Sequence, residues 1–288
     1  MITLAVLAAG MGSRFGGLKQ MVGFGPGGQT ILEYSVHDAK GAGFDAVVFL
    51  IRREMESDFR DLIFPRLPEG LNYSFAFQEL DDLPHGFTGS QREKPWGTGH
   101  AVWAMRQEIA GPFMVINADD FYGRDAFEII AAFLHRPSED YAMAGYPLRA
   151  TLSHHGSVAR GVCEVSSDGL LKKIEERTQL GFDQQGRCVD ELRGQVLADE
   201  TVVSMNCWGF QTTVFEGLQK GLTAFLEQSA EDSKAEFYLP ASIEQMIRNQ
   251  GQSVRVLPVT GEWLGVTYQQ DTDSVRKRLE EMKEAYVF

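Results

Sequence analysis

Hydrophobic residues in the first half of the chain fall into short uninterrupted runs separated by longer amphipathic stretches. The runs span residues 2–7, 46–51, 113–118 and 141–148, and residues 73–77 alternate in the manner of a strand. Runs of this length, rich in β-branched and aromatic residues, predict strands buried on both faces of a parallel sheet. The amphipathic stretches predict helices, so the pattern indicates consecutive βαβ units with right-handed crossovers.

The predicted helices of this half have recognisable boundaries. Thr30 and Glu33 have the spacing of a capping box, which predicts a helix that begins at Thr30 and ends near Gly41 or Gly43. Further helices are predicted at residues 54–62, 98–109 and 125–135, with a loop at 81–96.

The pattern is less regular after residue 148. Strand-like runs at 162–165 and 171–174 flank a turn at Asp168-Gly169, and the polar residues 178–201 are predicted to be irregular. The remaining predicted elements are a strand at 202–211, helices at 213–227 and 240–249, a strand at 254–259 and a helix at 273–285. No linker or repeat interrupts the chain, so one domain over residues 1–288 is expected.

Composition and charge narrow the class of protein. A chain of 288 residues, 43% of them hydrophobic, can bury a large core. The formal net charge of −13 argues against nucleic acid or anionic membrane as a partner. No apolar run has the length of a transmembrane helix, and the apolar start lacks the basic segment of a signal peptide. The three cysteines lack metal-binding spacing, so free thiols and a cytoplasmic location are expected.

The first predicted strand leads through Ala8 and Ala9 into a glycine-rich loop. The loop contains Gly10, Gly12, Gly16 and Gly17. Glycine lets backbone N–H groups approach a polyphosphate closely, because no Cβ atoms intervene. Arg14 and Lys19 add a planar cationic fork and a mobile point charge. The loop is therefore predicted to bind a triphosphate, although its spacing matches neither the dinucleotide fingerprint nor the Walker pattern.

The string Leu-Ala-Ala-Gly-Met-Gly-Ser-Arg at residues 7–14, followed by Lys19 and Gln20, resembles a known signature. It is similar to that of the sugar-phosphate nucleotidyltransferases, which make nucleoside-diphosphate (NDP) sugars. The cytidylyltransferases of isoprenoid synthesis share the motif, and Leu18 replaces the proline that normally precedes the lysine. The resemblance assigns Arg14 and Lys19 to catalysis on the triphosphate, and it assigns nucleotide contacts to Ala9, Gly10 and Gly12.

The resemblance also implies the architecture. It implies an α/β fold, a Rossmann-like three-layer arrangement with a mixed, mainly parallel sheet and a small acceptor-side insertion. Within the single catalytic domain, residues 1–150 would form the nucleotide-binding part and residues of about 150–205 the acceptor-side insertion. Residues 206–288 would supply the remaining sheet and the C-terminal helices.

Two carboxylates stand at the end of the predicted strand at 113–118. Asp119 and Asp120 lie where open α/β sheets bind ligands, and a carboxylate there can hold Mg²⁺ on substrate phosphates. The resemblance assigns Mg²⁺ to Asp119; the pair could instead cap the helix near Arg124. The family's second metal ligand, an aspartate two residues after a tryptophan, is replaced by Gly265. Asp271 is the expected substitute; otherwise the metal would rest on Asp119, phosphates and water.

Nucleobase and acceptor contacts also follow from the resemblance. Gln78 and the Gly97-Thr98 pair match the positions that contact the base, while Thr98 could instead cap a helix and His100 is interpreted as a packing residue. Residues matching the acceptor-binding positions are Gly161, Glu176, Arg177 and Asn206, of which Arg177 replaces a lysine.

The resulting hypothesis is an enzyme that joins an NTP and a sugar 1-phosphate to give an NDP-sugar and pyrophosphate. The acceptor could instead be a phosphorylated alcohol, as in a cytidylyltransferase. A glycosyltransferase on a related sheet and a non-catalytic nucleotide-sugar sensor also stay open as hypotheses. Neither the base nor the oligomeric state follows from the sequence, although relatives are commonly dimers or tetramers.

Overall fold

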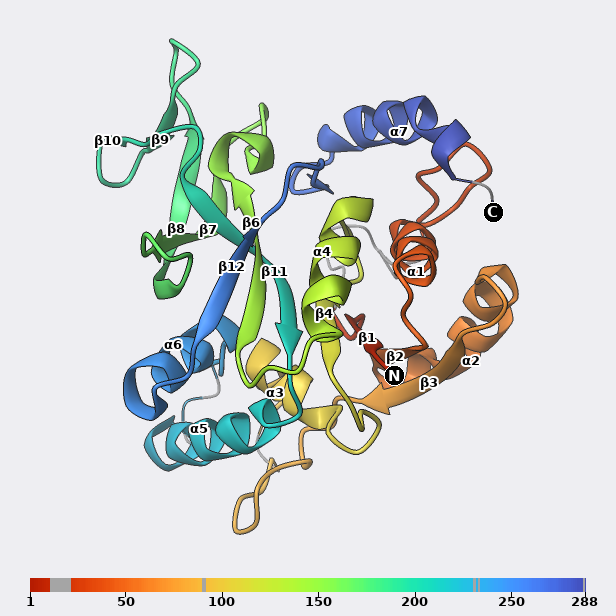
Figure 1. Cartoon of the computed structure of the whole chain (residues 1–288), viewed down its shortest axis with the longest axis vertical. Helices are drawn as coiled ribbons and strands as arrows, with labels where there is room; N and C mark the ends of the chain where they lie inside the picture. Colours follow the sequence, from red (N-terminus) through yellow and green to blue (C-terminus); the bar gives the residue numbers. More distant parts are fainter. Residues whose placement is uncertain (11–21, 90–91, 230–231, 233, 287) are drawn as a thin grey trace.

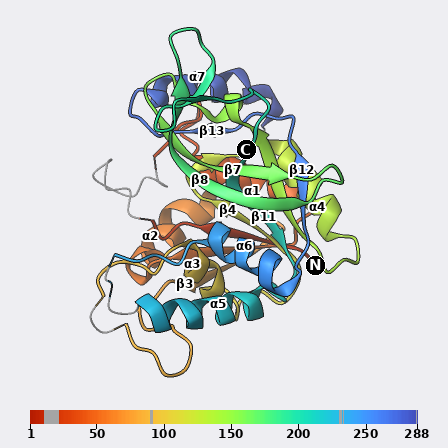
Figure 2. The same ribbon diagram turned by 90° about the vertical axis from the view of Figure 1, so that its left-hand side faces the viewer.

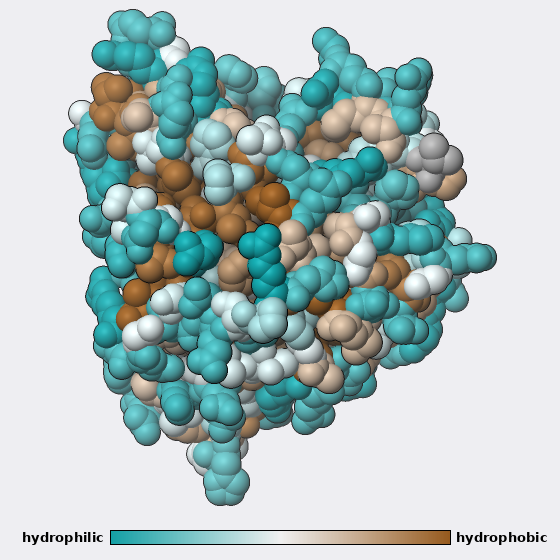
Figure 3. Space-filling model, viewed as in Figure 1, coloured by the Kyte–Doolittle hydropathy of each residue, from teal (hydrophilic) through white to brown (hydrophobic). Residues whose placement is uncertain are grey.

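The computed structural model describes residues 1–10, 22–89, 92–229, 232, 234–286 and 288. In this described part, an 11-stranded mixed sheet runs through the molecule between layers of helices (Figures 1 and 2). On the face seen in Figure 1, apolar residues gather towards the middle and hydrophilic residues cover most of the rim (Figure 3). No helix of the described chain is both long enough and apolar enough to cross a membrane.

One half of the sheet is parallel. Its strands, in spatial order, are β4 (Phe113–Asn117), β1 (Thr3–Leu7), β2 (Ala46–Ile51) and β3 (Asn72–Phe77). Because the strands share one direction, their carboxyl ends meet at a single edge, where sheets of this kind bind ligands.

The other half is largely antiparallel and is organised by β11 (Val202–Phe210), which pairs with β4. β11 also pairs with β6 (Tyr141–Pro147) and with β7 (Val158–Val165), and β6 pairs in parallel with β12 (Val254–Pro258). The sheet continues through β8 (Leu171–Phe182), β9 (Cys188–Asp190) and β10 (Gln195–Val196), the upper left arm of Figure 1. A separate two-stranded sheet joins β5 (Asp120–Phe121) to β13 (Leu264–Gly265).

Helices cover both faces of the sheet. α1 (Ile31–Gly41) and α4 (Arg124–Leu134) contact each other on one face. The opposite face carries α3 (Thr98–Ala104), α5 (Val214–Ser229) and α6 (Leu239–Gln250), which contact one another (Figure 2). α7 (Asp271–Glu281) contacts β13, and the short helical segments are Arg53–Met55, Glu56–Asp58 (α2), Phe59–Ile63, Phe64–Arg66, Leu148–Thr151 and Lys283–Ala285.

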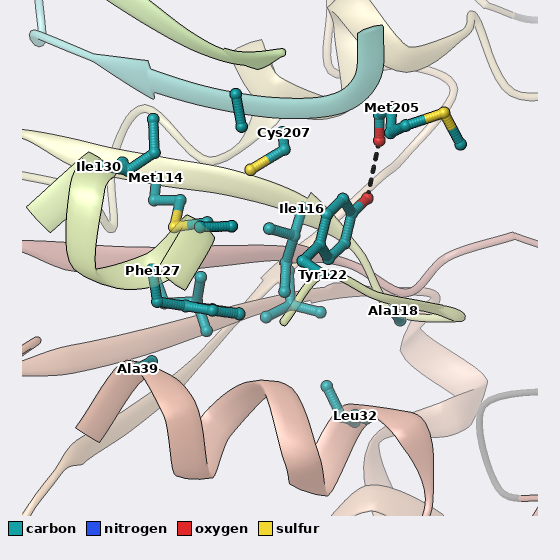
Figure 4. Packing of buried hydrophobic residues seen from close by; sticks show 14 of the residues in the cluster. Leu32, Ala39, Met114, Ile116, Ala118, Tyr122, Phe127, Ile130, Met205 and Cys207 are labelled. Carbon is teal, nitrogen blue, oxygen red and sulfur yellow. Dashed lines mark hydrogen bonds between the residues drawn. The ribbon is translucent and has the colours of Figure 1, made fainter. Parts of the chain in front are cut away.

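The uninterrupted hydrophobic runs form strands because the sheet is covered on both faces. In β4, Met114 and Ile116 pack with α1 and α4, whereas Phe113 and Val115 pack in the cluster under α3, α5 and α6. Figure 4 shows the first of these clusters, where Leu32 and Phe127 pack near Ile116. The α/β fold class predicted from the sequence is confirmed.

Most predicted elements of the first half are present, with boundaries shifted by a few residues. The capping box is formed, since the Glu33 amide donates to Thr30 Oγ1 (3.3 Å) and the Thr30 amide donates to Glu33 Oε2. The helix predicted at 54–62 is present, but as successive short 3₁₀, α and π segments over residues 53–66 rather than as one regular α-helix. The helix predicted to reach residue 109 ends at Ala104.

The prediction of irregular chain at residues 178–201 is wrong. β8 extends to Phe182, and two further strands, β9 and β10, follow it. The strand character is carried by a few buried residues, Leu180 and Cys188 among them, which join the core beneath this arm. Their polar neighbours face solvent, so the segment has little of the hydrophobicity of a central strand.

The C-terminal segment packs against α1 through a buried carboxylate. Asp38, whose side chain is 1% exposed, accepts hydrogen bonds from Tyr286 Oη (2.7 Å) and Arg124 Nε (3.2 Å). Burial raises the pKa of Asp38 from 3.8 to about 6, and the hydrogen bonds oppose the shift.

A raised pKa means that the folded state binds the Asp38 proton more tightly than the unfolded state. The corresponding stability is complete below pH 3.8 and is lost as the pH rises through about 6. In the wild type, this titration should lower the free energy of unfolding by up to about 3 kcal/mol between low and neutral pH. We expect the Asp38→Asn variant to lack this decrease, because asparagine does not titrate. Urea denaturation of the wild type and the variant at pH 4 and pH 7 measures this difference. If the free energy of unfolding changed equally with pH in both proteins, Asp38 would not be the group responsible.

Candidate active site

A cavity of about 680 Å³ lies where the parallel and antiparallel halves of the sheet diverge. The amino-terminal part of β11 pairs with β7, its carboxyl-terminal part pairs with β4, and the register of its pairing with β6 shifts between Ser204 and Trp208. Five residues predicted from the sequence line this cavity: Thr98, Asp119, Gly161, Glu176 and Asn206. Five separate segments of the chain supply them.

Asn206 lies at the irregular point of β11. Its φ of 59° is in the left-handed region, which asparagine tolerates better than most residues. Its side-chain amide donates to Asn117 Oδ1 (2.7 Å) and accepts from Trp208 Nε1 (3.1 Å). Asn117 in turn donates to Asp120 Oδ2 (2.9 Å). A chain of hydrogen bonds therefore runs from the Trp208 indole to the carboxylate of Asp120.

The two aspartates after β4 lie on the lining of the cavity, both half-buried. Tyr122 supports this turn from the core, because its hydroxyl accepts from the Asn117 amide (3.1 Å) and donates to the Met205 carbonyl (2.9 Å; Figure 4). Carboxylate oxygens at a strand end suit Mg²⁺, which is commonly held by one or two carboxylates together with substrate phosphates. In the described chain, no group of three or more His, Cys, Asp or Glu residues forms a protein-only metal cage.

The structure does not bring Asp271, the expected second metal ligand, to Asp119. Its Oδ2 accepts from the backbone amides of Thr267 (3.1 Å) and Tyr268 (2.7 Å), and its Oδ1 accepts from Ser153 Oγ (2.8 Å). Asp271 thus anchors the start of α7 and lines a neighbouring cavity of about 400 Å³. Its spacing from Trp263 in the sequence gives no indication of these hydrogen bonds.

Gly265, at the family position for the second aspartate, faces Asp120 across the β5–β13 pair. A Cβ built there would lie 2.2 Å from the Trp263 ring and 3.0 Å from Asp120 Oδ1. The indole of Trp263 therefore occupies the space that a side chain at residue 265 would need.

Arg177, the cationic residue predicted to bind the acceptor, does not face the cavity. Ile174, Glu176 and Thr178 line the cavity, so alternate residues of β8 face it. Arg177 faces the other way and forms ion pairs with Glu175 (3.2 Å) and Asp190 (3.5 Å). The structure therefore does not bring Arg177 to Glu176, although the two are adjacent in the sequence.

Arg160 lines the cavity instead and is only 9% exposed. Its guanidinium donates to the backbone carbonyls of Thr151 and Ala159 (2.8 Å to the latter) and lies 4.9 Å from the Trp263 ring centroid. In the described residues it forms no ion pair within 4 Å. Burial lowers the pKa of Arg160, and the nearby carboxylates, Asp120 first, oppose that shift. Partial desolvation in the cavity raises the pKa of Glu176, and Arg160 opposes it.

The predicted base-contacting residues form a second group beside the cavity. Gln78 follows β3, and its Nε2 donates to the Gly97 carbonyl (3.2 Å) and lies 3.3 Å from His100 Nδ1. Thr98 does not cap its own helix, whose N-cap is Gly97; its hydroxyl accepts from the Leu239 amide (3.0 Å) at the start of α6. Thr98 thus joins α3 to α6 at the rim of the cavity.

Phe237 leaves no room for a side chain at residues 97 and 99. A Cβ at Gly97 would lie 2.7 Å from the Phe237 carbonyl oxygen, and one at Gly99 would lie 2.7 Å from its ring. The Gly97 backbone also has φ 106° and ψ 179°, a conformation essentially limited to glycine. The absence of side chains at these positions is therefore explained by packing within the protein.

We expect Gly97→Ala to lower the free energy of unfolding by about 2–4 kcal/mol, because backbone strain and the clash with Phe237 add together. Gly86→Ala is the matched control, since Gly86 has φ 97° but no atom within 4 Å of its built Cβ. Urea denaturation of both variants measures the difference. Equal losses in the two variants would contradict the packing explanation.

Most of the glycine-rich loop lies outside the described residues. The predicted site residues Gly12, Arg14 and Lys19 are in this part of the loop. Its starting point is described. Leu7 is opposite Asn117 in the β1–β4 pair, and the Ala118 amide donates to the Leu7 carbonyl (3.1 Å). Ala9 and Gly10 follow directly, so the loop leaves the sheet beside Asp119.

Comparison with known protein families gives one domain match. Residues 4–75, which span β1 to β3 and the glycine-rich loop, match the MobA-like NTP transferase domain. No curated protein matches the sequence.

Solved structures are similar over almost the whole chain. UDP-glucose pyrophosphorylase complexed with UDP-glucose has a TM-score of 0.64 at 16% identity, covering 99% of this chain and 100% of that one. The inositol-1-phosphate CTP transferase of T. maritima has a TM-score of 0.64 at 13% identity, covering 99% and 98%. HddC from Yersinia pseudotuberculosis complexed with GMP-PN has a TM-score of 0.62 at 13% identity, covering 97% and 100%.

The matched domain, together with the fold, defines this protein as an enzyme of the nucleotidyltransferase type. The solved structures, at 13–16% identity, show that the chain shares their fold.

Proposed function

We propose that this enzyme joins an NTP to a sugar 1-phosphate, forming an NDP-sugar and pyrophosphate, with Mg²⁺ as cofactor. The observation that carries the proposal is the convergence of Thr98, Asp119, Gly161, Glu176 and Asn206 on one cavity. The cavity opens at the strand edge from which the glycine-rich loop departs, so an NTP on that loop would have its α-phosphate near the acceptor.

In the proposed reaction, a phosphate oxygen of the acceptor attacks the α-phosphorus of the NTP in line. A new P–O bond forms, the bond between the α-phosphorus and its bridging oxygen to the β-phosphate breaks, and pyrophosphate leaves. Such chemistry depends mainly on positioning and on neutralising charge. Arg14 and Lys19 would bind the triphosphate, and Gln78, Gly97 and Thr98 would contact the base.

Asp119 would hold Mg²⁺, with Asp120 beside it, and the ion would supply positive charge to the phosphates. On the acceptor side, Gly161 and Asn206 would contact the acceptor, and Glu176 would accept hydrogen bonds from its hydroxyl groups. We assign to Arg160, in place of Arg177, the cationic contact with the acceptor phosphate. This assignment is supported by the burial of its guanidinium on the lining of the cavity without a carboxylate partner in the described chain.

A phosphorylated alcohol is the second candidate acceptor. The similarity to an inositol-1-phosphate CTP transferase favours it, as does the outward position of Arg177, which replaces the lysine of the sugar-binding motif. A cytoplasmic location and a homo-oligomeric state remain part of the proposal.

The test is pyrophosphate release from each NTP with Mg²⁺, against a panel of sugar 1-phosphates and alcohol phosphates. The expected result is release with one NTP–acceptor pair that is lost in both Lys19→Ala and Asp119→Ala. Nucleotide or nucleotide-sugar binding by calorimetry without release from any pair would reject the transferase in favour of a sensor or a glycosyltransferase.

A further inference from the structure

His100, which the sequence alone suggests is a packing residue, determines how the amide of Gln78 is oriented. The imidazole is fully buried in α3, and its Nε2 lies 2.7 Å from the carbonyl oxygen of Asp82. Its Nδ1 lies 3.3 Å from Gln78 Nε2. His100 thus connects Asp82, in the loop after β3, to Gln78, the first residue after this strand.

The direction of each hydrogen bond follows from the groups involved. A backbone carbonyl can only accept, so His100 Nε2 carries the hydrogen that is donated to Asp82. Burial lowers the pKa of His100, which keeps the ring neutral and leaves Nδ1 with a lone pair. Nδ1 therefore accepts a hydrogen bond, and the atom of Gln78 facing it is the amide nitrogen.

The second hydrogen of the Gln78 amide is also committed. Gln78 Nε2 donates to the carbonyl of Gly97 at 3.2 Å, and that carbonyl can only accept. With both N–H groups directed at Gly97 and His100, the amide has no hydrogen left to donate to a ligand. A flipped amide would set its oxygen against the Gly97 carbonyl and the Nδ1 lone pair. Nδ1 would then lose its donor, and the Gly97 carbonyl would keep only the bond from the Ala101 amide (3.0 Å).

We propose that His100 is a positioning residue for base selection: it fixes Gln78 as a pure hydrogen-bond acceptor towards the nucleobase. The site would then select a base that offers an N–H donor at this point of its edge. A base with an acceptor there would face the Gln78 oxygen without a shared hydrogen. The inference rests on the proposed function, in which Gln78 contacts the base.

Two substitutions separate the two hydrogen bonds of His100. The amide oxygen of an asparagine lies near the position of Nδ1, so His100→Asn keeps an acceptor for Gln78 and loses the donor to Asp82. The amide nitrogen of a glutamine lies near the position of Nε2, so His100→Gln keeps the donor to Asp82 and loses the acceptor for Gln78. Gln78→Leu removes the base contact itself.

The experiment measures dissociation constants of the four NTPs in the presence of Mg²⁺ by calorimetry, for the wild type and these three variants. His100→Asn is expected to keep the ratio between preferred and disfavoured bases within about threefold of wild type. His100→Gln is expected to reduce that ratio about tenfold or more, because the Gln78 amide can then turn its N–H groups to the base. Melting temperatures accompany each measurement.

Several results would overturn the proposal. The first is an unchanged ratio in His100→Gln, and the second is an equal reduction in His100→Asn and His100→Gln. An unchanged ratio in Gln78→Leu would also overturn it, although pyrophosphate release by the wild type would then still support nucleotidyl transfer. Should His100→Gln fail to fold, ¹⁵N spectra of the wild-type histidines decide, since a hydrogen on Nδ1 of His100 would contradict the proposed orientation.

Discussion

Asp119→Asn is expected to lower kcat/KM for pyrophosphate release by about 100-fold or more, since a bound metal ion contributes several kcal/mol of charge stabilisation to the transition state. Asparagine has nearly the same shape but lacks the negative charge that holds Mg²⁺. Asp119 lies on the cavity lining directly after β4, beside the point where the glycine-rich loop leaves the sheet. The fold should be unaffected, because the side chain is half-buried at the edge of the cavity.

Asp120→Asn is the matched control for this prediction. The Asp120 carboxylate accepts from Asn117 Nδ2 (2.9 Å), so the substitution should disturb the chain of hydrogen bonds to Asn206 and have a smaller effect on the rate. Initial rates measured over a range of Mg²⁺ concentrations separate the two roles. If Asp120→Asn needed a higher Mg²⁺ concentration for half-maximal rate and Asp119→Asn did not, the metal ligand would be Asp120 and not Asp119.

Arg160→Gln is expected to raise the KM for the acceptor by roughly 10–100-fold, because a hydrogen bond between charged groups is lost. The KM for the NTP should stay within about threefold, because the substitution lies on the acceptor side. Arg160→Lys keeps the charge but not the planar fork, so an intermediate effect is expected. Glutamine can retain one of the hydrogen bonds to the Thr151 carbonyl, which limits the loss of stability.

Arg177→Gln provides the comparison for Arg160. Its ion pairs with Glu175 and Asp190 lie on the face of β8 away from the cavity, so the KM for the acceptor should change by less than about threefold. Steady-state kinetics with varied acceptor at saturating NTP measure both variants. A larger increase in KM for Arg177→Gln than for Arg160→Gln would contradict our assignment.

The sheet can be predicted well from the sequence because its signals are local. Each uninterrupted hydrophobic run at 2–7, 46–51 and 113–118 is buried on both faces, as its composition indicates. The order of the motifs also identifies Asp119, Gly161, Glu176 and Asn206 as site residues. In the structure these four residues line one cavity, although they are far apart in the chain. The roles of these residues remain predictions.

The wrong predictions concern the side of a strand on which a residue lies and the contacts between residues that are far apart in the sequence. Whether Glu176 or Arg177 faces the cavity depends on how β8 pairs with β7, and a motif contains no such information. The need for glycine at residue 97 comes from Phe237, which is far away in the sequence. Arg160 is buried by Thr151 and Trp263, so only the folded chain distinguishes it from a surface arginine.

The measurement that tests the proposed reaction most directly is ³¹P NMR of a mixture containing the preferred NTP, its acceptor and Mg²⁺. We expect one pyrophosphate for each NTP consumed, together with equal amounts of a product in which the α-phosphate and the acceptor phosphate form a diphosphate. Release of an NDP from a nucleotide sugar without pyrophosphate, or inorganic phosphate from NTP hydrolysis alone, would contradict nucleotidyl transfer.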